Sequence, residues 1–234
     1  MPPERLRAQV GPAPAFHDVA LTTMGRMNMA GLRPDHDVLD IGCGVGRTAR
    51  YLCDYMDSDA RYEGFDIMEE MIVWCQENIT PLFPHFRFTY TPLFNASYKP
   101  DESLPSAAEF SFPYPDSSFD FAFAHSVFTH LPPDSTGNYL RELHRVLRPG
   151  GIAYTTWFLF DGELSASPKT MVSEMTLDES GLFAIHNPEM PDNAVGYLEG
   201  YVLDEIEKSG LSVAGPVHYG FARLQDVVVA SRPL

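Results

Sequence analysis

The 234-residue chain has only three cysteines, and this scarcity excludes two kinds of site. Cys43, Cys53 and Cys75 are an odd number, and they lack the closely spaced pairs that bind structural zinc. A disulfide framework is also excluded, because such frameworks use an even number of cysteines in short secreted chains. We expect three reduced thiols.

Basic residues are also few, since 16 Lys and Arg stand against 32 Asp and Glu, for a net charge of −16. A surface with this balance repels a phosphate backbone, so we expect no nucleic acid as partner. No apolar run approaches the roughly 20 residues that span a bilayer, and residues 1–16 lack the apolar centre of a secretory signal. We therefore expect a cytoplasmic protein without a membrane partner.

Short apolar segments alternate with helical patterns along most of the chain. Strands are expected at 37–41, 61–67, 86–90, 119–124, 152–160, 211–219 and 226–230, and helices at 48–55, 69–78, 139–147 and 196–208. Strands that alternate with helices are joined by right-handed crossovers into a parallel sheet. The sequence therefore predicts an α/β fold with a Rossmann-like, mainly parallel sheet and helices on both faces.

The start of the chain and two internal stretches depart from this alternation. Residues 1–30 are expected to form an N-terminal arm with a helix at 16–29, in a position to cover the active site. Residues 31–234 are expected to form a single domain with insertions at about 95–111 and 161–193. Long irregular segments in a compact domain are commonly lids or binding loops, so we expect both insertions to lie over the substrate.

A glycine-rich loop follows the first expected strand and reads Asp40-Ile41-Gly42-Cys43-Gly44-Val45-Gly46. Glycines at such a turn let a ligand approach the backbone, and the helix that follows offers free amide groups. The Gly-x-Gly-x-x-Gly of nicotinamide enzymes needs a third glycine at position 47, where the chain has Arg47. Asp40 before the loop suits a ligand with an ammonium group better than one with a pyrophosphate.

An aspartate follows the second expected strand, in Gly64-Phe65-Asp66-Ile67. A carboxylate at this place can accept hydrogen bonds from the ribose hydroxyls of an adenosine ligand, and Ile67 and Met68 offer an apolar surface to the adenine ring. A single aspartate at a strand end is more often a turn or helix cap. The glycine loop one βα unit earlier favours the binding role.

Three motifs together resemble the class I S-adenosylmethionine-dependent methyltransferases over residues 36–160. They are Val38-Leu39-Asp40-Ile41-Gly42-Cys43-Gly44-Val45-Gly46, Phe112-Pro113-Tyr114-Pro115-Asp116-Ser117-Ser118-Phe119-Asp120 and Leu140-Arg141-Glu142-Leu143-His144-Arg145-Val146-Leu147-Arg148-Pro149-Gly150-Gly151. The resemblance implies a seven-stranded sheet with an antiparallel last strand, and a donor bound across the carboxyl ends of strands one, two and four.

The resemblance, with the reading of the two loops, gives a set of predicted S-adenosylmethionine contacts. They are Asp40, Gly42, Cys43, Gly44, Gly46, Asp66, Ile67, Met68, Phe110, His125 and Ser126. One departure concerns the acidic residue that relatives usually carry after strand three, where this chain reads Thr89-Tyr90-Thr91-Pro92. Glu109, or a backbone group near Phe110, is the candidate replacement.

Methyl transfer from a sulfonium is an in-line displacement, which requires alignment of the reactants and exclusion of water. A hydroxyl acceptor of high pKa also needs a base, whereas an amine must only arrive neutral. His125, His130 and His186 are the candidate bases, although each is more often a structural histidine. Metal catalysis is not expected, because strand four ends in His125-Ser126 and Asp161 is the only acid near the end of strand five.

The sequence therefore predicts S-adenosylmethionine-dependent methyl transfer to a small-molecule acceptor, on a hydroxyl of a secondary metabolite or sugar. Two alternatives are an N-methyltransferase and a non-catalytic protein that binds S-adenosylmethionine. A nicotinamide oxidoreductase is the third, and Arg47 opposes it.

Overall fold

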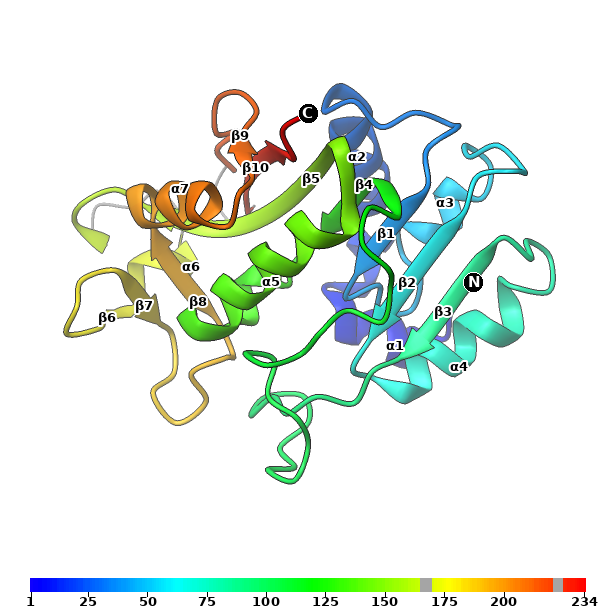
Figure 1. Ribbon diagram of the computed structural model, residues 1–234. Coiled ribbons are helices and arrows are strands. Elements are labelled where there is room, and N and C mark those ends of the chain that lie inside the picture. Colours follow the sequence, from blue (N-terminus) through cyan, green and yellow to red (C-terminus); the bar gives the residue numbers. More distant parts are fainter. Residues whose placement is uncertain (165–169, 221–224) are drawn as a thin grey trace.

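A computed structural model describes residues 1–164, 170–220 and 225–234 (Figure 1). The strands are β1 (Val38–Ile41), β2 (Tyr62–Asp66), β3 (Phe86–Tyr90), β4 (Phe119–Ala124), β5 (Leu147–Phe160), β6 (Thr176–Leu177), β7 (Phe183–Ile185), β8 (Val195–Leu198), β9 (Ser212–Val213) and β10 (Asp226–Ser231). Together they form one sheet, in which β3-β2-β1-β4-β5 are parallel neighbours. The predicted α/β fold with a mainly parallel sheet is confirmed.

Helices cover both faces of this sheet (Figure 1). They are α1 (Glu4–Arg7), α2 (Phe16–Met29), α3 (Ala49–Leu52), α4 (Glu69–Asn78), α5 (Pro133–Val146), α6 (Thr170–Ser173) and α7 (Glu199–Lys208), with 3-10 turns η1 (Ala8–Val10), η2 (Ala13–Ala15) and η3 (Phe128–His130). Alternating strand residues divide the core: α5 and α7 pack with Leu39 and Ile41, whereas α2, α3 and α4 pack on the side of Val38. None of the described helices is long and apolar enough to cross a bilayer.

The strand order changes direction between β1 and β4, and this change opens a crevice at the carboxyl ends of the strands. β1 pairs with β2 on one side and with β4 on the other, so their connections leave the sheet toward opposite faces. Open α/β sheets bind ligands at such a switch point. The glycine loop after β1, Asp66 at the end of β2 and His125 after β4 all meet there.

The last strand is antiparallel, as predicted, since β10 runs antiparallel to β5 and to β9. Within the described residues the sheet has ten strands rather than seven, and the additional ones are β6, β7 and β8. They arise from residues 176–198, most of which the sequence analysis treated as an irregular insertion. β8 pairs in parallel with the far end of β5, where Phe158 lies opposite Gly196.

Several predicted boundaries are wrong. The strand expected at 152–160 begins five residues earlier, at Leu147, and the helix expected at 48–55 shortens to Ala49–Leu52. The helix expected at 196–208 begins at Glu199, because Gly196 lies in β8 with the Met175 sulfur packed against its open side. The helix expected at 139–147 begins six residues earlier, at Pro133, whose fixed φ suits a first helical turn. The strand expected at 211–219 shortens to Ser212–Val213 and a single bridge at His218.

Candidate functional site

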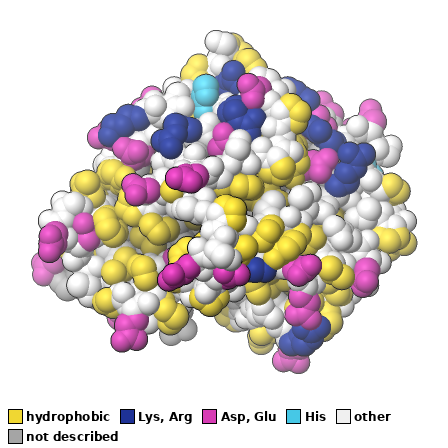
Figure 2. Space-filling model, turned by 60° about the horizontal axis from the view of Figure 1, so that its bottom comes forward, with side chains coloured by type: hydrophobic (Ala, Val, Ile, Leu, Met, Phe, Trp, Pro, Cys, Tyr) yellow, Lys and Arg dark blue, Asp and Glu magenta, His cyan; other side chains and the backbone are white. Residues whose placement is uncertain are grey.

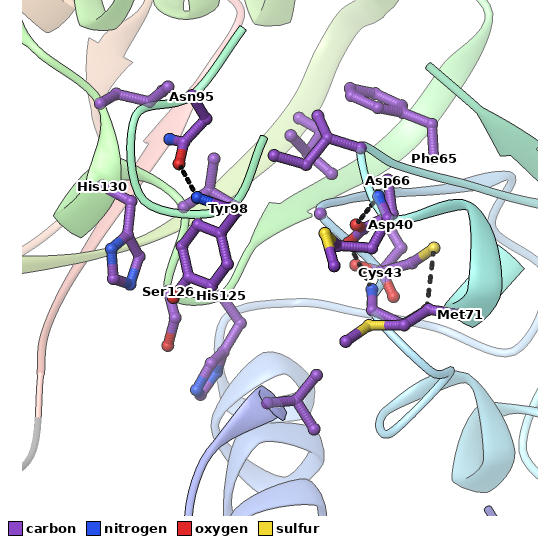
Figure 3. A pocket seen from close by; sticks show the side chains of 18 of the residues that line it. Asp40, Cys43, Phe65, Asp66, Met71, Asn95, Tyr98, His125, Ser126 and His130 are labelled. Carbon is purple, nitrogen blue, oxygen red and sulfur yellow. Dashed lines mark hydrogen bonds between the residues drawn. The ribbon is translucent and has the colours of Figure 1, made fainter. Parts of the chain in front are cut away.

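A cavity of about 320 Å³ lies at the carboxyl ends of β1, β2 and β4 (Figure 3). Figure 3 shows Asp40, Cys43 and Asp66 on one side of the view, and His125 and His130 on the other. The first group comes from the ends of β1 and β2, and the second from the segment after β4. The cavity therefore has one end built by the glycine loop and another built by histidines.

The glycine loop presents bare backbone to the cavity. Gly42 and Gly44 have φ values of 68° and 53°, a left-handed conformation that side chains disfavour. A Cβ on Gly42 would lie 2.5 Å from Val127 Cγ2, and one on Gly44 would lie 2.8 Å from Val10 Cγ1. The loop is held by the amides of Gly42 and Cys43, which donate to the carbonyl of Phe65 at 2.9 and 3.0 Å.

Asp66 ties the second strand to this loop. One carboxylate oxygen accepts the amide of Gly44 at 2.7 Å, and the other accepts the amide of Met68 at 2.8 Å. Burial raises the pKa of Asp66, and the hydrogen bonds from these amides oppose the rise. Each carboxylate oxygen keeps a lone pair for a further donor, such as a ribose hydroxyl.

Asp40 lies deeper in the cavity and is buried against Tyr62, whose hydroxyl donates to its carboxylate at 2.5 Å. Burial raises the pKa of Asp40 to about 8. A bound ammonium group would favour the charged carboxylate. Asp40 therefore fits the role that the sequence analysis gave it.

Arg47 lines the same end of the cavity, and the sequence analysis missed it as a binding residue. Its guanidinium donates to the carbonyl of Val10 at 2.5 Å. Among the described lining residues, Arg47 is the only Lys or Arg, so it is the natural partner for a ligand carboxylate. Its place in the turn between the glycine loop and α3 was the available signal.

Not every predicted donor contact lies on the cavity wall. Ile67, Met68, His125 and Ser126 line it. Gly46 instead faces α4, where a Cβ would lie 2.8 Å from Ile79 Cδ1.

Phe110, predicted to replace the missing acidic contact through its backbone, makes other contacts in the structure. The ring of Phe110 packs against Phe65 at a centroid distance of 5.8 Å, and its carbonyl accepts the Asn138 amide at 2.8 Å. Glu109, the other candidate replacement, is exposed. Neither residue lies among the described residues of the cavity wall.

Ser126 adopts a φ of 61° directly after β4, an uncommon conformation for a residue with a side chain. Its amide donates to the Thr156 hydroxyl at 2.8 Å, and its hydroxyl accepts the Gln225 amide at 2.8 Å. Such strain persists where surrounding bonds over-determine the backbone, commonly at functional sites.

His125 is held by α2, because its Nδ1 lies 3.0 Å from the Thr23 hydroxyl. Burial, together with the positive charges of Arg47 and Arg26, lowers the pKa of His125 to about 3. A histidine of this pKa is neutral at pH 7 but is a weak base.

His130, at the end of η3, has a better-defined geometry. Its Nδ1 lies 3.0 Å from the backbone carbonyl of Asp192. A carbonyl only accepts, so the Nδ1 carries the proton and the Nε2 keeps a lone pair. Burial lowers the pKa of His130, and backbone hydrogen bonds to Asp192 and Asn193 oppose this fall.

The structure does not bring His186 to the other two histidines. His186 is exposed after β7, and its Nε2 lies 3.8 Å from the Glu174 carboxylate. It is not among the lining residues within the described ranges 1–164, 170–220 and 225–234.

Two of the three segments that the sequence analysis placed over the site contribute to its wall. The described residues of the third, the insertion at 161–193, supply none of the lining residues. The N-terminal arm supplies Gln9, Val10 and Gly11. The first insertion supplies Asn95 and Tyr98, which Figure 3 shows close to His130 and His125. The sequence analysis named neither, because a turn within an irregular segment has no periodic pattern.

The described residues contain no group of three or more His, Cys, Asp or Glu side chains that could hold a metal ion. Metal independence stays a prediction from the sequence.

We expect Gly42→Ala to weaken S-adenosylmethionine binding about 10-fold or more, because the new methyl group forces the loop away from Val127. Gly181→Ala is the matched control: Gly181 has a φ of 72°, and its Cβ would meet no atom within 4 Å. Both variants carry the same backbone strain of about 1–2 kcal/mol, so only the close approach differs. Equal S-adenosylmethionine affinity in the two variants, measured by calorimetry, would show that the glycine loop does not bind the methyl donor.

Comparisons with known proteins find methyltransferases similar to this chain. Sterol 24-C-methyltransferase ERG6B of Gibberella zeae is 29% identical over 56% of this chain and 30% of its own length. The 27-O-demethylrifamycin SV methyltransferase of Amycolatopsis mediterranei is 29% identical over 53% of this chain and 39% of its own length. The chain thus spans about a third of the length of these curated relatives.

The fold also matches solved structures. A SAM-dependent methyltransferase from Aquifex aeolicus has a TM-score of 0.59 at 20% identity, over 99% of both chains. The family model described as a methyltransferase domain matches residues 39–155, half of the chain. This range holds the glycine loop, Asp66, His125 and His130. The chain therefore belongs to the methyltransferase-domain family, within the class I S-adenosylmethionine-dependent methyltransferases that its three motifs resemble.

Proposed function

We propose that the protein transfers the methyl group of S-adenosylmethionine to a hydroxyl of an apolar small molecule, with His130 as the general base. The donor end of the cavity fits this cofactor: Asp40 for its ammonium, Arg47 for its carboxylate and Asp66 for its ribose hydroxyls. The residues from Ile67 to Met68 would lie along its adenine ring.

The observation that carries the proposal is the contact of His130 Nδ1 with the backbone carbonyl of Asp192, at 3.0 Å, which leaves Nε2 as the basic nitrogen of the ring. The Asp192 carbonyl fixes the proton on Nδ1, and burial keeps the ring neutral. A neutral imidazole with this tautomer can accept a proton from a hydroxyl at its open nitrogen. His125 is a poorer base because its pKa is lowered further, to about 3.

Methyl transfer to a hydroxyl needs one base, which takes the proton that the acceptor loses. When bound, S-adenosylmethionine supplies an electrophilic methyl carbon, whose bond to sulfur breaks with the electron pair returning to sulfur. The acceptor oxygen forms the new bond to carbon, and its proton passes to His130 Nε2. The cavity walls align the two reactants and exclude water, which supplies much of the rate.

The acceptor end of the cavity favours an apolar, uncharged molecule. It is walled by Phe94, Tyr98, Val127, Leu131 and Tyr139. Figure 2, which views the face at the carboxyl ends of the strands, shows broad hydrophobic areas with acidic side chains among them, and Lys and Arg mainly toward the upper part. A phosphorylated acceptor would meet little positive charge here.

The names of two relatives support an acceptor of this class, since one refers to a sterol and the other to a rifamycin. Those names also refer to a carbon and an oxygen acceptor, so the choice of oxygen rests on His130.

The test is a screen with methyl-labelled S-adenosylmethionine against matched acceptors: hydroxylated apolar compounds, the same compounds with an amine in place of the hydroxyl, and their phosphate esters. We expect label in the hydroxylated set. Label confined to the amines would support the N-methyltransferase alternative. Donor binding without label in any acceptor would support the non-catalytic alternative.

A further inference from the structure

Asp192 joins three separate segments at the acceptor end of the cavity. It lies between β7 and β8 and is 5% exposed, although Pro191 and Asn193 beside it are exposed. Its carboxylate accepts the amide of Ala96 at 2.5 Å and the hydroxyl of Ser97 at 2.7 Å. Its backbone carbonyl is the acceptor of His130 Nδ1 at 3.0 Å. One residue therefore contacts both the first insertion and the proposed base.

The segment that Asp192 holds is a preformed turn at residues 95–99. The side-chain oxygen of Asn95 accepts the amides of Ser97 and Tyr98 at 3.1 and 2.8 Å. The backbones of Asn95 and Lys99 exchange two hydrogen bonds across the turn, at 3.1 and 2.8 Å. Because the turn is tied internally, it can move as one unit. Its hydrogen bonds to Asp192 fix it to the β7–β8 loop, and at its other end the Lys99 ammonium donates to the Tyr90 hydroxyl of β3.

The turn carries Tyr98 to the cavity. The Tyr98 ring lies 5.4 Å from the His130 ring in an edge-to-face arrangement. Figure 3 shows Tyr98 between Asn95 and His125, over the acceptor end. An acceptor bound beside His130 would therefore contact this turn.

We infer that Asp192 is a positioning residue that couples closure of the turn 95–99 over the acceptor to the tautomer of His130. With the turn closed, the buried carboxylate has its donors and the carbonyl of the same residue orients the imidazole. With the turn open, the Asp192 carboxylate loses its two donors and is hydrated by water. The position of Asp192 is then no longer fixed, and its backbone carbonyl cannot hold the His130 ring in one orientation. Closure of the turn then fixes the Nδ1–H tautomer of His130 at the same time as it excludes water. This inference rests on the proposed role of His130.

The test uses Asp192→Asn in the full chain, with Asp178→Asn as the matched control. Asp178 makes the same kind of turn, since its carboxylate accepts the amide and hydroxyl of Ser180 at 2.9 and 2.8 Å. Asp178 is half-buried and is not among the described lining residues, so its replacement should show only the effect of loosening a turn. Ser97→Ala removes one of the two bonds without a change of charge and serves if Asp192→Asn folds poorly.

Two readouts need no acceptor. Nitrogen-15 NMR of the imidazole should give the Nδ1–H tautomer of His130 in the wild type and in Asp178→Asn, and a mixture of tautomers in Asp192→Asn. Hydrogen exchange at Ser97 and Tyr98 should be faster in Asp192→Asn and Ser97→Ala only. With an acceptor in hand, kcat/KM should fall between about 10-fold and 100-fold in Asp192→Asn, with an unchanged Kd for S-adenosylmethionine.

The Nε2–H tautomer in the wild type, or an unchanged His130 signal in Asp192→Asn while exchange accelerates, would overturn the coupling even if the protein is an active methyltransferase. Failure to bind S-adenosylmethionine would contradict the proposed function instead. In that case the tautomer and exchange results would still decide whether Asp192 couples the two segments.

Discussion

Replacing Asp66 by asparagine is expected to weaken S-adenosylmethionine binding by at least about 100-fold, which corresponds to about 2.7 kcal/mol. The ribose hydroxyls would donate to a carboxylate, and hydrogen bonds to charged groups are worth about 1.5–3 kcal/mol each. Asparagine has one acceptor oxygen in place of two, and the amides of Gly44 and Met68 already claim both oxygens of the native side chain. Calorimetric titration measures the loss directly.

Glu63→Gln is the matched control for this experiment. Glu63 lies on the same strand, is also buried, and pairs with Arg87 at 3.5 Å, away from the cavity. Both variants neutralise one buried acid of β2, so they share the change of charge and differ in the contact with the cavity. If Glu63→Gln weakened S-adenosylmethionine binding as much, the loss would come from a disturbed β2 and not from a missing ribose contact.

Replacing His130 by glutamine should lower kcat by about 10²–10⁴-fold with a hydroxyl acceptor, the range of a general base. Donor affinity should not change, because His130 lies at the acceptor end. His186→Gln, on an exposed residue outside the described cavity wall, should keep full activity. His125→Gln should cost less than His130→Gln, because His125 is the weaker base.

The pH profile separates a base from a merely structural histidine. A base works when unprotonated, so wild-type activity should fall as the pH drops through the pKa of His130. Burial lowers that pKa below the usual 6.5, so the fall should lie below pH 6.5. This limb should be absent from the residual activity of His130→Gln. The same acidic limb in the variant would remove His130 from the role of base.

The parallel half of the fold could be predicted from the sequence because its strands are buried on both faces. β1 and β4 read as short apolar runs bounded by polar turns, and α4 begins and ends at the predicted residues Glu69 and Asn78. The start of α5 was missed because Ser135, Thr136 and Gly137 are poor helix formers. Tertiary packing holds them in the helix, where all three are buried.

The strands β6, β7 and β8 were missed for a related reason. Their residues span two to four positions each, too short for a period to appear. β8 depends on the extended far end of β5, and no local signal predicts how far a strand continues beyond its neighbours.

The donor end of the site was largely predictable, because the glycine loop and Asp66 are adjacent to their own strands. Asp40, Gly42, Cys43, Gly44, Asp66, Ile67 and Met68 all line the cavity. The acceptor end was not, because Tyr98 and Asp192 meet His130 only through the packing of two insertions. Residues 165–169, which belong to the second insertion, lie outside the described residues.

The central claim is that this cavity binds S-adenosylmethionine, and calorimetric titration of the wild-type protein tests it most directly. Titration with S-adenosylmethionine and, separately, with S-adenosylhomocysteine should give one site per chain and a micromolar Kd, about −8 kcal/mol. No heat from either ligand, with a sample that unfolds cooperatively, would contradict the assignment of the cavity as a donor site.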